Sequence, residues 1–258
     1  MSWRVLTAGL ALAVLIGAPR AGAAGPDDLQ AAFRAAFGAG SLRRVMQPQH
    51  PPGAAKGDHY RQAPVELTLK PSLLAPLGDG RYALVVSETN VLGAHMDPGA
   101  VAIAYLKPMG GRWRVENVWP EFIWTGNTGH PADAIRLLSF SKPPMVALTS
   151  QYMGQGQGST TAWIIRLAGP GPRFLGRVPS GGGLEPDACT GCDAYDYQGA
   201  IGPPRRVRDV LSVTYVGRIE RQGRWRPIRQ QADFRSRGGD LVPTKPIRLP
   251  WLTATGRD

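Results

Sequence analysis

Glycine and proline constrain the fold of this chain more than any other feature of its sequence. The 258 residues include 33 glycines and 24 prolines, which is more than a fifth of the chain against roughly 12% in average usage. Both residue types interrupt helices and favour turns, and here they separate short apolar runs rich in β-branched and aromatic residues. The sequence therefore predicts many short strands joined by turns, and it excludes a helical bundle or a coiled coil.

The apolar runs predict about ten strands in an all-β antiparallel meander. Tyr82–Ser87 and Val101–Leu106 are apolar throughout, as expected for strands buried on both faces. Trp113–Trp119 alternates instead, so its two tryptophans and Val115 are expected on one face. The remaining strands are expected at residues 135–140, 146–152, 162–167, 173–178, 195–201, 210–219 and 224–230.

Three hairpins of this meander are similar in sequence. Each reads strand, turn, aromatic residue, strand, and the aromatic residues are Trp113, Phe174 and Trp225. Repeats of this length indicate propeller blades, although three units of about three strands are fewer than a propeller contains. The predicted architecture is a sandwich, a partly closed barrel or a propeller-like array, with a short N-terminal helix.

The segment from Leu77 to Val86 (LGDGRYALVV) resembles the turn and strand of FG-GAP propeller repeats. In that family an Asp-rich calcium loop precedes the strand, whereas Asp79 stands alone here. The resemblance therefore implies no metal loop, and a Gly-Asp-Gly hairpin turn accounts for the same residues.

The first 23 residues have the layout of a cleaved secretory signal. Arg4 supplies a positive charge, Val5–Ile16 is apolar, and Ala21–Ala23 offers a small-residue cleavage site. The apolar run is shorter than the about 20 residues that a membrane-spanning helix needs. We therefore expect a periplasmic or secreted protein that does not span the membrane after cleavage.

The mature chain is expected to divide into two parts. Residues 24–64 predict a helix followed by a Pro-rich connector, and residues 65–258 predict a single β-rich domain. The helix should begin at Pro26, be favoured by acidic residues in its first turn, and end at Gly38. Residues 41–64 show no periodicity, so they predict an irregular connector.

Cys189 and Cys192, the only cysteines, predict a structural disulfide rather than a redox-active pair. An exported chain enters an oxidising compartment, and the pair is flanked by acidic residues where a reactive thiolate needs positive charge. The acidic residues around the pair do not have EF-hand spacing, and the four histidines form no zinc motif. The sequence therefore predicts neither a metal site nor a cofactor.

The segment from Trp119 to Asp133 is the candidate ligand site, because a long loop between strands is where binding residues collect. Indole faces stack on sugar rings or partner side chains, and amides and carboxylates orient hydroxyls. If the site is catalytic, Glu121 is the best acid or base, since aromatic neighbours would raise its pKa. In the alternative, the aromatic residues are core residues that cap the sheet. The candidate residues are Trp119, Glu121, Trp124, Asn127, His130 and Asp133.

Positive charge is concentrated near the C-terminus. The formal net charge is +11, and ten arginines lie against three acidic residues between Pro203 and Arg237. Basic residues interleaved with aromatic residues are typical of nucleic-acid binders, but an exported protein meets acidic glycans and lipid headgroups instead. The stretch is either a solvated strand face or a surface for anionic polymers formed by Arg218, Arg221, Arg224, Arg226 and Arg229.

Together these features favour an exported, non-catalytic protein that binds a glycan or a protein partner in the cell envelope. Two alternatives stay open. One is a cell-envelope hydrolase that uses a carboxylate such as Glu121, and the other is a basic protein held on anionic components of the envelope surface.

Overall fold

The described residues form one short helix and thirteen strands, which pair antiparallel in two sheets. The all-β prediction is therefore confirmed, and each of the ten expected strands overlaps a strand of the structure. The signal segment 1–23 and both cysteines lie outside the described part of the chain. The structure, a computed structural model, describes residues 26–50, 62–93, 97–139, 141–154, 156–185, 193–203, 210–237 and 240–247.

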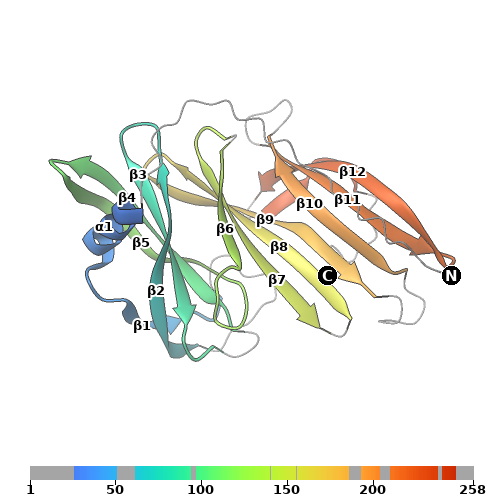
Figure 1. The fold of residues 1–258 in the computed structure, drawn as a ribbon, viewed down its shortest axis with the longest axis horizontal. Helices are drawn as coiled ribbons and strands as arrows, with labels where there is room; N and C mark the ends of the chain where they lie inside the picture. The colour runs from blue at the N-terminus through green and yellow to red at the C-terminus, as the bar shows by residue number, and fades with distance from the viewer. Residues whose placement is uncertain are drawn as a thin grey trace, which may run out of the picture.

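The first sheet has five strands, and helix α1 (Pro26–Phe37) covers one of its faces (Figure 1). The helix begins and ends where the sequence predicts, and the Gly38 N–H donates to the Arg34 carbonyl at 2.9 Å. Its buried Ala32 and Phe33 pack on a sheet face that β4 supplies with alanines. The strands, in sheet order, are β1 (Leu42–Gln47), β2 (Ala63–Pro76), β3 (Tyr82–Asn90), β4 (Gly99–Met109) and β5 (Arg112–Thr125).

Strand β1 corrects the prediction of an irregular connector in this region. Residues 42–47 pair with β2 in a continuous register from Leu42↔Thr68 to Gln47↔Ala63. Side chains along β1 alternate between exposed and more buried positions, as they do on any edge strand that covers a core. Two arginines among its six residues, and prolines just beyond it, hide this alternation in the sequence.

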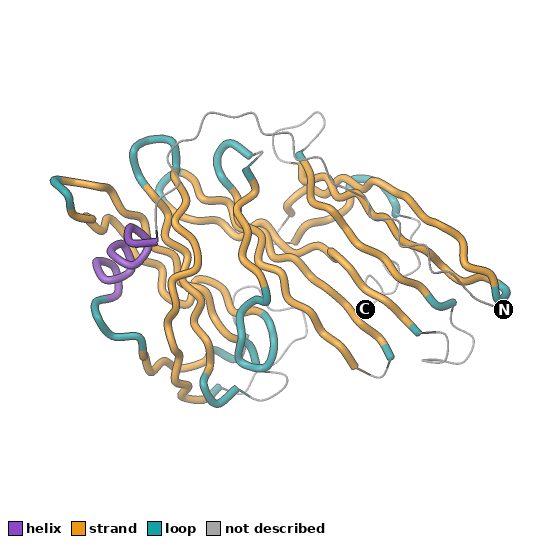
Figure 2. The backbone as a smooth tube through the Cα atoms, in the orientation of Figure 1, coloured by secondary structure: helices purple, strands orange, loops and turns teal. Residues whose placement is uncertain are grey.

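The second sheet has eight strands and curls into a half-barrel (Figures 1 and 2). Its last strand returns to β9, where a Cβ on Gly176 would lie 2.3 Å from the Leu241 backbone nitrogen. The Ser236 hydroxyl donates to the Leu175 carbonyl at 2.7 Å and fixes the same closure. The strands run in chain order across the sheet as β6 (Ala134–Leu138), β7 (Met145–Gly154), β8 (Gln157–Ala168), β9 (Gly171–Leu184), β10 (Tyr195–Gly202), β11 (Val210–Arg221), β12 (Arg224–Arg237) and β13 (Asp240–Pro243).

The two sheets share one core cluster. Val85 and Ile103 of the first sheet and Val146, Leu148 and Ile165 of the second are fully buried in it. The face of the five-stranded sheet that does not carry α1 is therefore covered by β7 and β8.

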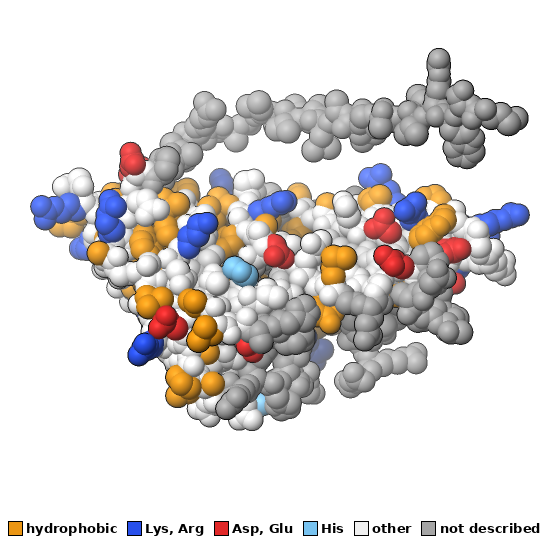
Figure 3. Space-filling view, turned by 60° about the horizontal axis from the view of Figure 1, so that its bottom comes forward, with side chains coloured by type: hydrophobic (Ala, Val, Ile, Leu, Met, Phe, Trp, Pro, Cys, Tyr) orange, Lys and Arg blue, Asp and Glu red, His pale blue; other side chains and the backbone are white. Residues whose placement is uncertain are grey.

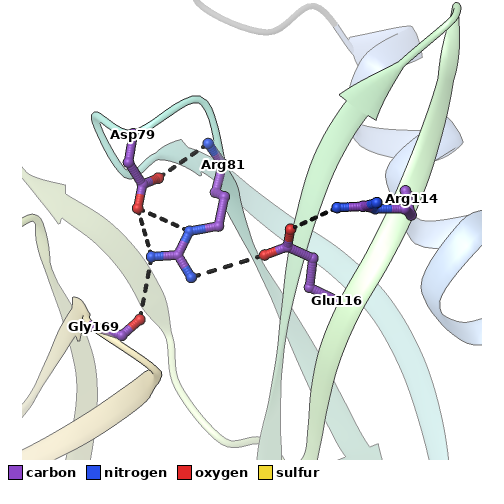
Figure 4. Close-up of polar contacts among 5 residues, drawn as sticks. All are labelled: Asp79, Arg81, Arg114, Glu116 and Gly169. Atoms are coloured by element: carbon purple, nitrogen blue, oxygen red, sulfur yellow. Dashed lines mark hydrogen bonds and ion pairs between the residues drawn. The ribbon is translucent and has the colours of Figure 1, made fainter.

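Arg81 links the sheets at one end of this interface (Figure 4). Its guanidinium binds Asp79 in the β2–β3 turn at 2.5 Å and donates to the Gly169 carbonyl of the β8–β9 turn at 3.2 Å. Glu116 on β5 lies 3.9 Å from the other side of the guanidinium. The hydrogen bond from Arg81 lowers the pKa of Asp79. The Gly-Asp-Gly segment is thus a hairpin turn that also holds the second sheet.

One bulge in β5 overturns the expectation that Trp113, Val115 and Trp119 share a face. Trp113 and Val115 pack in the cluster under α1, whereas Trp119 packs in the cluster between the sheets. The register shifts between Tyr105 and Leu106 of the partner strand, so β5 carries an extra residue there. An extra residue moves the following side chains to the opposite face.

Candidate functional site

The candidate loop is shorter than expected, because β5 continues to Thr125 and leaves only residues 126–133 as the connection to β6. Trp119 contacts the Tyr105 ring edge-to-face with centroids 4.8 Å apart, in the core between the sheets. Trp124 is 2% exposed and packs in the core under α1. The two indoles therefore lie in different core clusters, and the structure does not bring the six candidate residues together.

Glu121 occupies a second bulge of β5 and takes part in a three-residue ion cluster. Arg43 Nη1 donates to Glu88 Oε1 at 3.1 Å, and Arg43 Nη2 lies 2.7 Å from Glu121 Oε1 as an ion pair without hydrogen-bond alignment. The backbone N–H of Glu121 donates to Glu88 Oε2 at 3.1 Å. Strands β1, β3 and β5 are thus tied together above the alanines of β4.

Burial controls the protonation of this cluster. Glu88 is 0% exposed, and desolvation together with the nearby Glu121 carboxylate raises its pKa to about 7 against the opposing effect of Arg43. Desolvation also raises the pKa of Glu121, as its aromatic surroundings predicted. Glu88 is closed to solvent, whereas the Glu121 side chain is 21% exposed, and together with Arg43 the two carboxylates connect three strands of the sheet. No local pattern points to Glu88, because it is a single acidic residue in a largely apolar strand.

Asn127 and Asp133 both hold the same backbone segment of β7. Asn127 Nδ2 donates to the Gln151 carbonyl at 2.8 Å, and Asp133 Oδ2 accepts from the Gln151 N–H at 2.6 Å. His130 is exposed, and its backbone N–H closes the turn on the Asn127 carbonyl at 2.9 Å. Three of the candidate residues therefore belong to a turn that fixes the end of β7.

A pocket of about 900 Å³ lies beside Gln151. It forms where β7 and β9 end and where β8, β10 and β12 begin, so its lining comes from strands that are distant in sequence. Its polar lining groups are the amides of Gln151, Gln157 and Gln198, the hydroxyls of Ser159, Thr160 and Ser180, the carboxylates of Glu185 and Asp196, and the guanidinium of Arg218; its aromatic residues are Tyr152, Tyr195, Tyr197 and Trp225.

Glycines expose backbone along this pocket. Gly158 of β8 pairs with Gly183 of β9, and Gly182 lines the pocket next to them. A Cβ on Gly182 would lie 3.0 Å from the Tyr197 ring, so only glycine lets that ring lie against the strand. The Tyr197 ring packs edge-to-face on Tyr215 at 5.9 Å, which keeps it in place.

On the β11–β12 side of the pocket, Trp225 and Arg218 form an exposed aromatic platform. Trp225 is 41% exposed, and the Arg218 guanidinium stacks on its ring at 4.6 Å from the centroid. Arg218 Nε also lies 3.9 Å from Asp196 Oδ2 across the β10–β11 ladder. Across the pocket, Tyr152 and Met153 at the end of β7 are exposed as well. A ligand here would contact apolar surface at both rims and polar groups between them.

All five arginines of the predicted anionic surface are exposed on the β11–β12 hairpin, but they occupy two faces. Directly opposed residues in an antiparallel ladder share a face. The pairs Arg218↔Pro227, Val216↔Arg229 and Glu220↔Trp225 place Arg218 and Arg229 with the indole. The other face carries Arg221, Arg224 and Arg226.

Comparisons with protein-family models, curated proteins and solved structures found no match to this chain. Within the described ranges, no group of three or more His, Cys, Asp or Glu side chains is placed to hold a metal ion. No helix in the described part of the chain is long and apolar enough to cross a membrane.

Proposed function

We propose that this chain is an exported, non-catalytic binding protein that holds a glycan in the pocket beside Trp225. The export part of the proposal rests on the N-terminal sequence, which has the order of a cleaved signal. The binding part rests on the pocket, whose volume of about 900 Å³ lies in the range of small-molecule sites.

The observation that carries the proposal is the combination of an exposed indole with amides and hydroxyls on a glycine-lined surface. A sugar ring offers a flat C–H face and a rim of hydroxyls, so it needs stacking area and planar hydrogen-bonding groups together. Trp225 supplies the first, and Gln198, Asp196 and Thr160 supply the second. The pocket holds two carboxylates and one guanidinium, a balance that favours a neutral glycan over an acidic one.

A binding experiment with neutral sugars tests this proposal. The mature protein is screened against immobilised neutral oligosaccharides of several linkages, and affinity for the best one is measured by calorimetry. Trp225→Ala is expected to weaken binding by about tenfold or more because it removes the stacking surface. Met109→Ala truncates another exposed apolar side chain, in the β4–β5 hairpin outside the pocket, and is expected to leave affinity unchanged. Absence of binding to every neutral sugar, or equal loss in both variants, contradicts the proposal.

A further inference from the structure

The tip of the β11–β12 hairpin carries a cluster of arginines on the face that does not carry Trp225. Arg221 and Arg224 pair directly across the ladder, and Arg226 pairs with Ile219 two positions away. Side chains at these positions share one face, so three guanidiniums lie close together at the end of the hairpin. Figure 3, which keeps the horizontal axis of Figure 1, shows basic side chains projecting at the end of the molecule where this hairpin lies.

This arrangement is electrostatically unfavourable in the protein alone. Like charges directly opposite each other destabilise a ladder, and Arg221↔Arg224 is such a pair. Asp193 offers only partial compensation, since its Oδ2 lies 3.9 Å from Arg221 Nε and both side chains are mostly exposed. Among the described residues, Arg224 and Arg226 have no acidic partner within ion-pair distance. A bound anion would remove the repulsion and so gain binding energy.

We infer that this face, formed by Arg221, Arg224 and Arg226, docks on a linear anionic polysaccharide that carries carboxylate or sulfate groups. Guanidinium groups bind such oxyanions through paired N–H donors, and three neighbouring guanidiniums offer separate contacts to the successive anionic groups of a repeating polymer. The turn residues between the strands, Gln222 and Gly223, carry no apolar side chain. Docking on a lipid surface gains from buried apolar area, and the exposed part of this face offers none.

The polymer site is independent of the pocket, because the pocket's Arg218 and Trp225 lie on the other face of the hairpin. The test uses the mature full chain and three probes: immobilised dextran sulfate, immobilised neutral dextran, and phosphatidylcholine vesicles with or without phosphatidylglycerol. Two matched variants each remove three charges. The tip variant combines Arg221→Gln, Arg224→Gln and Arg226→Gln, and the control combines Arg112→Gln, Arg136→Gln and Arg173→Gln, which are exposed on three other strands.

The wild-type chain is expected to bind dextran sulfate in a salt-dependent manner and to ignore neutral dextran. The tip variant should lose about tenfold or more in affinity for dextran sulfate, while the control variant should lose less than about threefold. Equal losses in both variants would show that net charge alone governs binding and would overturn the inference. Stronger binding to phosphatidylglycerol vesicles than to dextran sulfate would overturn it too, and so would retention that does not respond to salt. Neutral-sugar binding in the pocket should survive in the tip variant.

Discussion

The Asp133 carboxylate accepts a 2.6 Å hydrogen bond from the backbone N–H of Gln151, a residue that lines the pocket. The β5–β6 turn therefore positions one wall of the site without lining it. Asn127 adds a second bond to the same residue.

Asp133→Ala should loosen this wall, whereas Asp133→Asn should preserve most of it, because the amide oxygen can still accept the bond. We expect hydrogen exchange of the Gln151 amide to become about tenfold faster in the alanine variant, with weaker binding of neutral sugars in the pocket. NMR-detected exchange measures this directly. If the alanine and asparagine variants exchange alike, the hydrogen bond does not hold the strand.

Glu88→Gln should change how stability depends on pH. The pKa of Glu88 is raised from its ordinary value of 4.5 to about 7 in the folded protein, so the folded state binds the proton more tightly than the unfolded state does. Stability is therefore greatest below pH 4.5 as far as this group is concerned, and it falls as pH rises to about 7. The full shift corresponds to about 3 kcal/mol.

The glutamine variant mimics the protonated acid, so it should be more stable than the wild type at pH 8 and should lose most of the slope between pH 5 and 8. Denaturant unfolding at several pH values tests both expectations. The matched variant Glu66→Gln, at an exposed ion pair with Arg44, should leave the slope intact. A wild-type stability that rises over this range would contradict the assignment.

Arg218→Gln should weaken the aromatic platform while leaving the fold intact. Its guanidinium stacks on the Trp225 ring at 4.6 Å and fixes the indole for stacking. We expect affinity for a neutral oligosaccharide to fall by about three- to tenfold in calorimetry. Arg229→Gln removes a charge from the same face and serves as the control. Equal effects of the two substitutions would assign the loss to charge rather than to stacking.

Gly129→Ala should destabilise the β5–β6 turn more than Gly110→Ala destabilises the β4–β5 turn. Both glycines have positive φ, at 77° and 59°. A Cβ on Gly129 would lie 2.3 Å from the Asn90 carbonyl oxygen, whereas Gly110 has open space around it. We expect a cost of about 1 kcal/mol at Gly110 and about 3 kcal/mol at Gly129, measured by thermal or denaturant unfolding. Equal costs would mean that the backbone relaxes around the new methyl group.

The N-terminal and cysteine predictions need no structure to be tested. Intact mass of the exported protein should correspond to a chain that begins near Ala24.

Alkylation should modify Cys189 and Cys192 only after reduction, as expected for a disulfide in an oxidising compartment. A soluble exported form that retains residues 1–23, or thiols that react without reduction, would contradict these predictions.

Local patterns in the sequence predicted the elements well. The helix at Pro26–Phe37 follows from its capping residues and its four-residue apolar spacing, and the doubly buried β4 follows from its continuous apolar run. The patterns failed at the β-bulges, where extra residues in one strand change the direction of the side chains that follow. The bulge near Glu116 turned Trp119 to the opposite face, and β5 continues through a second bulge at Glu121 as far as Thr125, about half of the expected loop.

Local sequence patterns could not predict the pocket, for a different reason. Its lining depends on the register that places Gly158 opposite Gly183 and Asp196 opposite Arg218. Hydrophobic alternation specifies which face a side chain takes, but it does not specify which residues of two polar, glycine-rich strands stand opposite each other. The glycine run at residues 181–183 was the available signal, because consecutive glycines in a strand mark a close approach by another group.

In the described ranges, each strand pairs with its neighbour in the chain, and the chain passes from one sheet to the other once, through residues 126–133. Each sheet is thus built from one continuous stretch of the chain, and the first sheet is complete at Thr125. The face of the first sheet that carries Val85 and Ile103 is covered only when Val146, Leu148 and Ile165 of the second sheet pack on it. An intermediate in which only the first sheet has formed exposes this apolar face, and exposed apolar surface is where aggregation competes with folding.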